Sequence, residues 1–263
     1  MKTTRKPPAA NHAPTKPVAS GVTPLSRLMF TERVGIATRW GIYLTAIERQ
    51  ALDAALALLP RPTDALELGC QGGRWSEVLV GKGWRVTCTD VDETALDACR
   101  ARLPTARCVL VKPEDRTIPC EDGSADFLLC IEVPPVIQSD WFPAEAHRVL
   151  RPGGVVLGVI QNKRSLRGMF VRMRERFPLT RGPEKGADTY TVSYGEWKRS
   201  MQRMSFRFHF QRGFCWFPFS RTSDSPLVPA CSRIERVLGL QKVPAASPWV
   251  AFVARKSVAG PAE

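Results

Sequence analysis

A glycine-rich turn at residues 66–75 (LELGCQGGRW) constrains the fold of this chain more than any other segment. Glu67 lies near the end of a short apolar run, two residues before Gly69, and Gly73 begins a stretch with helical spacing. Glycines let a ligand approach the backbone closely, and the N–H groups of such a turn remain available to bind it. The turn therefore predicts a nucleotide-type binding site between a strand and a helix.

Apolar runs and amphipathic stretches alternate regularly from residue 62 onward. Strands are predicted at residues 64–69, 85–90, 108–111, 125–131 and 155–160. Helices are predicted at residues 44–59, 73–80, 93–103 and 141–150. This alternation predicts a doubly wound α/β fold, in which helices cover both faces of a parallel sheet.

An acid ends the strand that follows the glycine turn. Asp90 stands 23 residues after Glu67, and Asp92 is placed to cap the next helix. A carboxylate at the end of the second strand can accept hydrogen bonds from both hydroxyls of a ribose. The glycine turn, the helix after it and the strand-end acid therefore have the order and spacing expected of one nucleotide-type site.

Residues 62–160 resemble the class I S-adenosylmethionine-dependent methyltransferases, and most closely the type 11-like group that acts on small molecules. Glu67, Gly69 and Gly73 match the acid-x-G-x-G-x-G motif of that superfamily, and Asp90 matches its ribose-binding acid. The segment 148–154 (RVLRPGG) is similar to the family's lead into the fifth strand. The resemblance implies a Rossmann-like sheet of seven strands, the last one antiparallel, with a helical insertion after strand five.

The resemblance also implies an enzyme whose cofactor is S-adenosylmethionine. The implied cofactor-binding residues are Glu67, Gly69, Cys70, Gln71, Gly73, Asp90, Val91, Glu114, Asp115 and Ile131. By the same resemblance, Glu114 and Asp115 lie near the adenine and Ile131 lies at the methionyl end. For Glu67 the alternative is a buried acid that caps a helix, and the motif context favours the ligand role. The pair at 114–115 is equally a solvated loop.

Two positions depart from the family pattern. Gln71 stands where the family has its middle glycine, and glutamine at a positive φ costs on the order of 1 kcal/mol. Pro134 and Pro135 follow strand four, where the family often has Glu-His, so no dedicated base or other catalytic residue is identified. The expected reaction is methyl transfer to a small-molecule or lipid-like acceptor by proximity and alignment. A cofactor-binding scaffold without activity remains the non-enzymatic alternative.

The formal charge of +13 is spread unevenly along the chain. Residues 31–160 carry −4, whereas residues 161–213 carry +9. The latter stretch contains basic helices at 165–177 and 195–204 around a Gly/Pro-rich loop, which predicts a lid beside the sheet. Such a lid suits an anionic or membrane-associated acceptor, while an RNA- or protein-directed methyltransferase is the rival reading.

The domain organisation follows from these patterns. Residues 1–24 form a basic Pro/Ala-rich tail that is expected to be disordered, and residues 25–263 form a single domain. Within it lie a cofactor-binding core at 62–160, the basic lid at 161–213, and C-terminal strands with an aromatic loop at 214–263. No apolar stretch reaches the roughly 20 residues that a transmembrane helix needs.

Acceptor recognition is expected from the segments after strand five. The candidate residues are Asn162, Tyr190, Tyr194, Trp216 and Arg221, with packing under the insertion as the alternative role for the aromatic ones. The eight cysteines include no C-x-x-C pair and the chain has three histidines, so no metal site is expected. Thiols in apolar runs suit a reducing, cytoplasmic location, with peripheral membrane contact as a further expectation.

Overall fold

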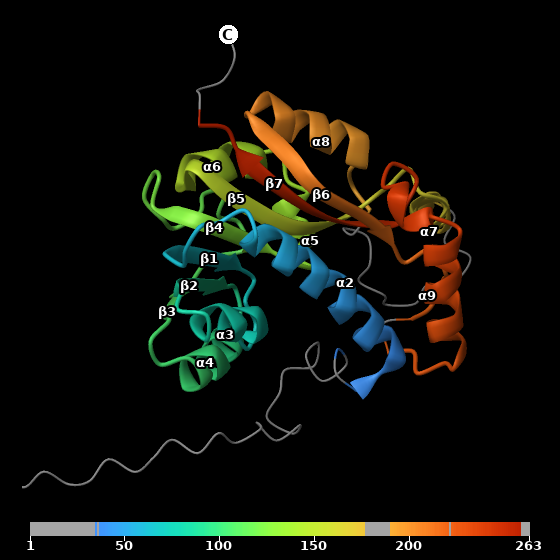
Figure 1. Cartoon of the computed structure of the whole chain (residues 1–263), viewed down its shortest axis with the longest axis horizontal. Helices are drawn as coiled ribbons and strands as arrows, with labels where there is room; N and C mark the ends of the chain where they lie inside the picture. The colour runs from blue at the N-terminus through green and yellow to red at the C-terminus, as the bar shows by residue number, and fades with distance from the viewer. Residues whose placement is uncertain (1–34, 36, 177–189, 221, 259–263) are drawn as a thin grey trace, which may run out of the picture.

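The computed structural model describes residues 35, 37–176, 190–220 and 222–258, and in them one sheet of seven strands with the order β3-β2-β1-β4-β5-β7-β6 (Figure 1). The strands are β1 (Asp64–Leu68), β2 (Arg85–Asp90), β3 (Arg107–Leu110), β4 (Ala125–Cys130), β5 (Leu150–Gln161), β6 (Phe206–Phe214) and β7 (Trp249–Lys256). β7 runs antiparallel to both of its neighbours, and the other adjacent strands pair in parallel. The predicted doubly wound sheet with an antiparallel last strand is confirmed.

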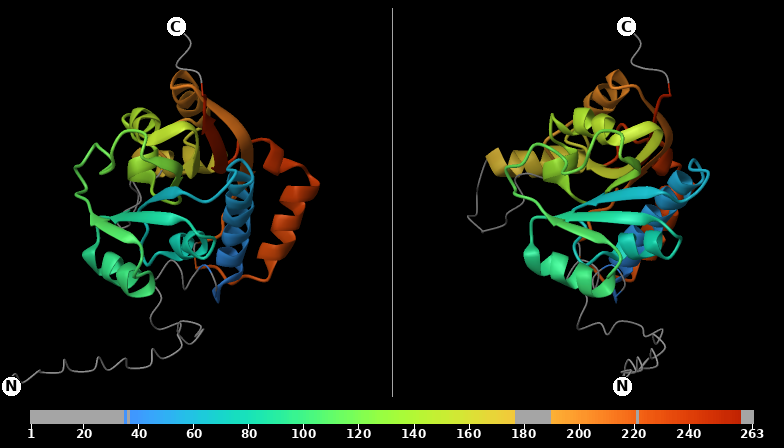
Figure 2. Two further views of the ribbon diagram at one scale, coloured as in Figure 1. Left: turned by 60° about the vertical axis from the view of Figure 1, so that its left-hand side comes forward. Right: turned by 90° about the vertical axis from the view of Figure 1, so that its left-hand side faces the viewer.

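Helices cover both faces of this sheet (Figures 1 and 2). They are α2 (Arg39–Leu56), α3 (Arg74–Val80), α4 (Glu93–Arg102), α5 (Pro134–Ile137), α6 (Phe142–Val149), α7 (Leu166–Arg176), α8 (Tyr194–Arg203), α9 (Leu227–Val237) and the 3-10 helix η2 (Leu240–Lys242). The predicted N-cap of α4 is confirmed, since the Asp92 Oδ1 accepts a hydrogen bond from the Thr94 N–H at 2.9 Å. None of the helices in the described ranges is both long enough and apolar enough to span a bilayer.

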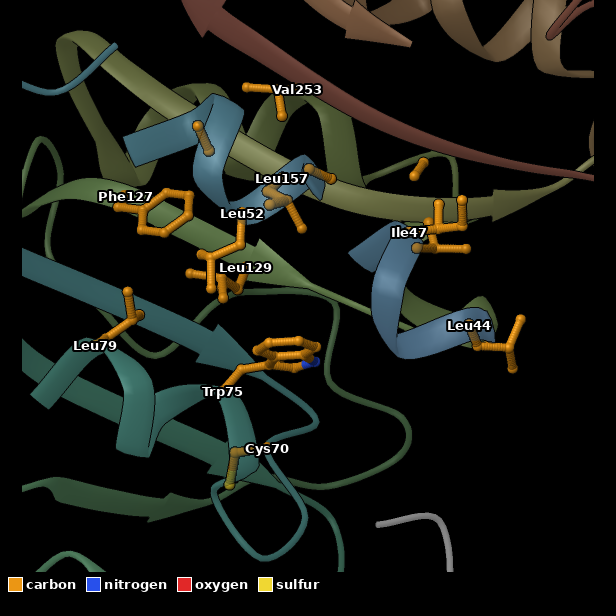
Figure 3. Close-up of a cluster of buried hydrophobic side chains, with 14 of the residues drawn as sticks. Leu44, Ile47, Leu52, Cys70, Trp75, Leu79, Phe127, Leu129, Leu157 and Val253 are labelled. Atoms are coloured by element: carbon orange, nitrogen blue, oxygen red, sulfur yellow. The ribbon is translucent and has the colours of Figure 1, made fainter. Parts of the chain in front are cut away.

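The core on one face joins the sheet to α2, α3 and α4. Leu52 of α2 and Leu79 of α3 are completely buried against side chains of the central strands, among them Phe127 and Leu157 (Figure 3). Successive side chains of a strand point to opposite faces of the sheet, and both faces of β5 are buried from Val155 onward: Leu157 belongs to this core and Val156 to the opposite one. Burying one such side chain contributes roughly 1.5–3 kcal/mol.

The core on the other face includes α8, which sequence analysis assigned to a lid. The Trp197 ring lies 4.7 Å from the Phe252 ring of β7, and its Nε1–H donates to the Ile137 carbonyl at 2.8 Å. Tyr194 and Met201 are buried in the same cluster. The lid prediction for 161–213 is therefore wrong for α8, because its apolar face is needed to cover β5, β6 and β7.

Two helices were missed because prolines begin them. The sequence predicts only strands and an aromatic loop at 214–263, yet α9 lies inside this stretch with Pro229 in its first turn. α5 carries Pro134 and Pro135 at its first positions. Proline is tolerated there because the first helical N–H groups have no acceptor within the helix. The predicted tail at 1–24 lies outside the described residues.

The close approach of three elements at Gly158 of β5 yields a stability prediction. A Cβ at this position would lie 2.2 Å from the Ile137 Cδ1 and 3.0 Å from the Cys130 carbonyl oxygen. Gly158→Ala should therefore lower the free energy of unfolding by about 1–3 kcal/mol, measured by urea denaturation. Gly195→Ala in α8 is the matched control: the nearest atom to its Cβ would be 4.0 Å away, so it should be neutral or stabilising. Equal effects of the two substitutions would contradict this packing.

Candidate functional site

The strand order reverses direction between β1 and β4, so the loops that follow these two strands diverge at one edge of the sheet. Open α/β sheets bind ligands in the crevice at such a point, outside the carboxyl ends of the strands. Gly69 directly follows β1 and has φ of 67°, and a Cβ there would lie 2.5 Å from the Val133 Cγ2 in the loop after β4. Glycine is therefore required where these two loops meet.

The Asp90 carboxylate fixes the conformation of the glycine turn. Its Oδ2 accepts a hydrogen bond from the Gln71 N–H at 2.8 Å, and its Oδ1 accepts one from the Asp92 N–H at 3.1 Å. The Cys70 N–H also donates to the Thr89 carbonyl at 2.9 Å, which ties the turn to β2. Each carboxylate oxygen keeps a second lone pair, so Asp90 can hold the turn and still accept from a ligand's hydroxyls.

Three residues other than glycine adopt a left-handed backbone at this edge. Gln71 has φ of 48° in the turn, Glu132 has φ of 57° in the loop after β4, and Cys215 has φ of 63° directly after β6. Each such residue costs on the order of 1–3 kcal/mol, and strain of this kind concentrates at functional sites. The sequence patterns did not single out Glu132 as a site residue. Its position as an acid at a strand end, as with Asp90, is the signal that could have identified it.

Glu67 is buried under the turn rather than facing it. Its carboxylate accepts a hydrogen bond from the Ser76 hydroxyl of α3, so it joins β1 to the helix that follows the turn. Burial raises the pKa of Glu67 to about 7, against the lowering effect of the Ser76 hydrogen bond. The acid therefore anchors α3, and its contact with a cofactor remains a prediction.

The start of α3 is also held from the N-terminal side. Arg74 forms an ion pair with the buried Glu48 of α2, and its Nη1 donates to the Thr45 Oγ1 at 3.2 Å. The same guanidinium lies 4.4 Å from the centre of the Trp75 ring. These contacts connect α2 to the helix end that faces the crevice.

The remaining predicted cofactor residues lie at the same edge in different environments. Gly73 caps α3 with φ of 77°, Val91 is exposed after β2, and Ile131 is half-buried after β4. Glu114 and Asp115 are exposed in the loop after β3, where the Asp115 Oδ2 accepts from the Lys112 N–H. Their contact with a cofactor stays a prediction.

Cys70 differs from these residues because its side chain is buried in the core. Its sulfur lies within 4.8 Å of the sulfurs of Cys88 and Cys99 (Figure 3 labels Cys70), and its thiol donates to the Gln71 carbonyl at 3.5 Å. Contact of Cys70 with a cofactor stays a prediction.

The structure gives two predicted acceptor residues a different role. Asn162 is fully buried after β5, where its Nδ2 donates to the carbonyls of Ala245 and Ser247. Its Oδ1 accepts from the N–H groups of Arg164 and Tyr194. Tyr194 is buried, and its hydroxyl donates to the Gln211 Oε1 at 2.8 Å. Both side chains are occupied in holding the insertion on the sheet, which corrects the predicted acceptor contacts.

Two further acceptor candidates, Tyr190 and Trp216, lie near the carboxyl edge. Tyr190 is buried, and its hydroxyl accepts from the Trp249 Nε1–H at 3.0 Å. Trp216 follows β6, and its N–H donates to the buried Glu235 of α9. Arg221 lies outside the described residues. An acceptor role for these three residues stays a prediction.

A cavity of about 680 Å³ lies at the opposite edge of the sheet. Its lining includes Asp64, Arg85, Arg107 and Ala125, which are the first residues of β1, β2, β3 and β4. The strands carry the glycine turn and Asp90 at their other ends. This cavity is therefore separate from the crevice.

Comparison with known proteins agrees with the interpretation of the crevice as a ligand-binding site. Residues 66–158 match the family model described as a methyltransferase domain. An uncharacterised methyltransferase of Mycobacterium bovis is 36% identical over 123 residues, which are 47% of this chain and 49% of that protein. The chain thus spans about half the length of the curated relatives it matches.

Solved structures share the fold at low sequence identity. An S-adenosylmethionine-dependent methyltransferase of Methanosarcina mazei has a TM-score of 0.54 and 18% identity over 78% of this chain and 97% of its own. An S-adenosylmethionine-dependent methyltransferase of Mesorhizobium loti has a TM-score of 0.55 and 16% identity, and the match covers 78% of this chain and 96% of that chain. At this level of identity the likenesses show that the fold is shared.

The left-handed conformation of Gln71 yields the first prediction for the site. Gln71→Gly should raise the free energy of unfolding by about 1 kcal/mol and keep or improve the affinity for S-adenosylhomocysteine, measured by calorimetry. Ser205→Gly is the control, since Ser205 has φ of 60° after α8 and should gain stability without changing affinity. A tenfold loss of affinity in Gln71→Gly would show that the glutamine side chain contacts the cofactor.

The double role of Asp90 yields the second prediction. Asp90→Asn should weaken S-adenosylhomocysteine binding by roughly 2–4 kcal/mol, because an amide cannot accept from the turn and from the ribose as a carboxylate does. Asp92→Asn is the matched control, since asparagine caps a helix as well as aspartate. Unchanged affinity in a folded Asp90→Asn protein would remove the ribose assignment.

Proposed function

We propose that this chain, whose residues 66–158 form a class I S-adenosylmethionine-dependent methyltransferase domain, transfers a methyl group to a small-molecule or lipid-like acceptor. The methyl-donor part of the proposal rests on the glycine turn and Asp90 at the switch point of the sheet. The acceptor part rests on one observation, the exposed apolar row of α7 beside this crevice.

The residues at the crevice fit the cofactor. Asp90 has lone pairs left for two ribose hydroxyls, and Gly69 leaves the turn open where a Cβ would collide with Val133. S-adenosylmethionine supplies a methyl group made electrophilic by its sulfonium. The work left to the protein is to align the acceptor and to exclude water, worth up to about 7–11 kcal/mol in favourable cases. A dedicated base is not required when the acceptor is already nucleophilic.

One face of α7 is apolar and open to solvent. Its residues stand at helical spacing i, i+3, i+4 and i+7, and their exposed fractions are 78% for Leu166, 50% for Met169, 58% for Phe170 and 56% for Met173. Arg172 on the same helix is also exposed. An apolar row next to a basic side chain supports an acceptor with an apolar body and a negative group, or contact with an anionic lipid surface.

The base of α7 is fixed next to the crevice. The Gly168 N–H donates to the Ser165 Oγ at 2.9 Å, and a Cβ on Gly168 would lie 2.5 Å from the Asn162 carbonyl oxygen. The Arg167 Nη2 donates to the Phe219 carbonyl at 3.4 Å, so α7 also contacts the segment that follows β6. This contact supports a position of α7 beside the carboxyl edge of the sheet.

A matched pair of acceptors tests the proposal. Methyl transfer from labelled S-adenosylmethionine would be measured with a phenol that carries a long alkyl chain and with the same phenol without the chain. The double variant Met169→Gln, Phe170→Gln should raise KM for the alkylated phenol about tenfold, because tenfold corresponds to about 1.4 kcal/mol of lost apolar burial. Its affinity for S-adenosylhomocysteine should stay within a few fold.

The control uses exposed apolar residues away from the crevice. Val237 and Leu238 at the end of α9 are 78% and 66% exposed, and their replacement by Gln should leave both KM values unchanged. Equal KM values for the two phenols in the wild-type protein would contradict the acceptor class. Methyl transfer confined to RNA or to protein substrates would overturn the proposed acceptor class in favour of an RNA- or protein-directed methyltransferase.

A cytoplasmic location belongs to the same proposal, since all eight thiols are free.

A further inference from the structure

Three buried thiols converge behind the glycine turn. The sulfurs of Cys70, Cys88 and Cys99 all lie within 4.8 Å of one another. They come from three separate elements: the turn after β1, the strand β2 and the helix α4. Cys108 on β3 stands beside Cys88 in the register of the parallel strands, so it offers a fourth thiol on the same side of the sheet. The spacing of these residues along the chain gave no sign of this cluster.

The distances suit a cation that prefers sulfur. In a tetrahedral site with metal–sulfur bonds of about 2.3 Å, two sulfur ligands lie roughly 3.8 Å apart. The three sulfurs therefore need to move by no more than about 1 Å to share one ion. A single buried cysteine packs as a small apolar residue, but packing alone does not require three thiols from three elements to meet at one point.

We propose that Cys70, Cys88 and Cys99 form a structural site for a thiophilic divalent cation of the zinc class, with Cys108 as the adjacent fourth thiol. The site lies on the core side of the turn whose outer side faces the crevice. A Cβ on Gly73 would lie 2.8 Å from the Cys99 sulfur, so the turn backbone rests directly on the cluster. An ion there holds β1, β2 and α4 together at the point where the turn begins.

Occupancy of this site stabilises the turn in the conformation that binds cofactor. Zinc should therefore raise the affinity for S-adenosylhomocysteine, and by linkage S-adenosylhomocysteine should raise the affinity for zinc by the same factor, about fivefold or more. This consequence rests on the proposed function, whereas the binding of the ion does not.

The test uses the full chain prepared under reducing conditions and loaded with Zn²⁺ or with Co²⁺ alone. We expect one zinc per chain by elemental analysis, and absorption bands of thiolate-to-cobalt charge transfer with Co²⁺. The melting temperature should rise with zinc concentration, because an ion that binds the folded chain stabilises it. Cys88→Ala and Cys99→Ala keep small apolar side chains, and each should weaken zinc binding by more than about 100-fold, the upper range for losing an outer-shell partner.

Cys130→Ala is the matched control, since Cys130 is an equally buried thiol on β4 outside the cluster. It should leave zinc affinity and the cobalt spectrum unchanged. The proposal is overturned if the wild-type chain retains no zinc, if the cluster variants retain it as well as the control does, or if mass spectrometry of the unreduced protein finds two of these cysteines joined in a disulfide that excludes the ion. Zinc bound with no affinity for S-adenosylhomocysteine would support the metal site and contradict the proposed function.

Discussion

The two hydrogen bonds that the Asp90 carboxylate accepts are the interaction on which the site depends. One comes from the Gln71 N–H in the glycine turn, the other from the Asp92 N–H at the start of α4. One side chain at the end of β2 therefore sets the path of the chain after β1 and the start of the following helix. A charged acceptor is suited to this task, since a hydrogen bond to a charged group contributes about 1.5–3 kcal/mol. The strain at Gln71 is tolerated because this bond holds the turn.

The two faces of the sheet have different tasks around this point. α2 and α3 brace the turn from one side, through the Arg74–Glu48 ion pair and the Leu52 and Leu79 core. α8 covers the opposite face and buries Tyr194, Trp197 and Met201 against it. α7 carries an apolar row that the rest of the described chain leaves exposed. The glycine turn and Asp90 are thus built into the core, whereas the acceptor site that we propose lies on a surface helix.

Much of this arrangement could be predicted from the sequence, because local signals determine it. The period of apolar residues placed the central strands, and the strand-end acid placed Asp90. The errors concern contacts between distant segments. Nothing in the sequence near Asn162 or Tyr194 indicates that both are used to fix the insertion on β5 and β6. The meeting of Cys70, Cys88 and Cys99 depends on the pairing of strands and the docking of α4, so the absence of a C-x-x-C pair was no guide to it.

A crystal structure of the chain with S-adenosylhomocysteine tests directly whether Asp90 both holds the turn and binds the ribose. The ribose is expected over the carboxyl ends of β1 and β2, with both hydroxyls within hydrogen-bond distance of the Asp90 carboxylate. The turn from Gly69 to Gly73 should keep its conformation, including the hydrogen bond from the Gln71 N–H to Asp90. A nucleoside bound elsewhere, for example in the cavity at the amino ends of the strands, would contradict this double role of Asp90. The absence of bound nucleoside at saturating concentration would contradict it as well.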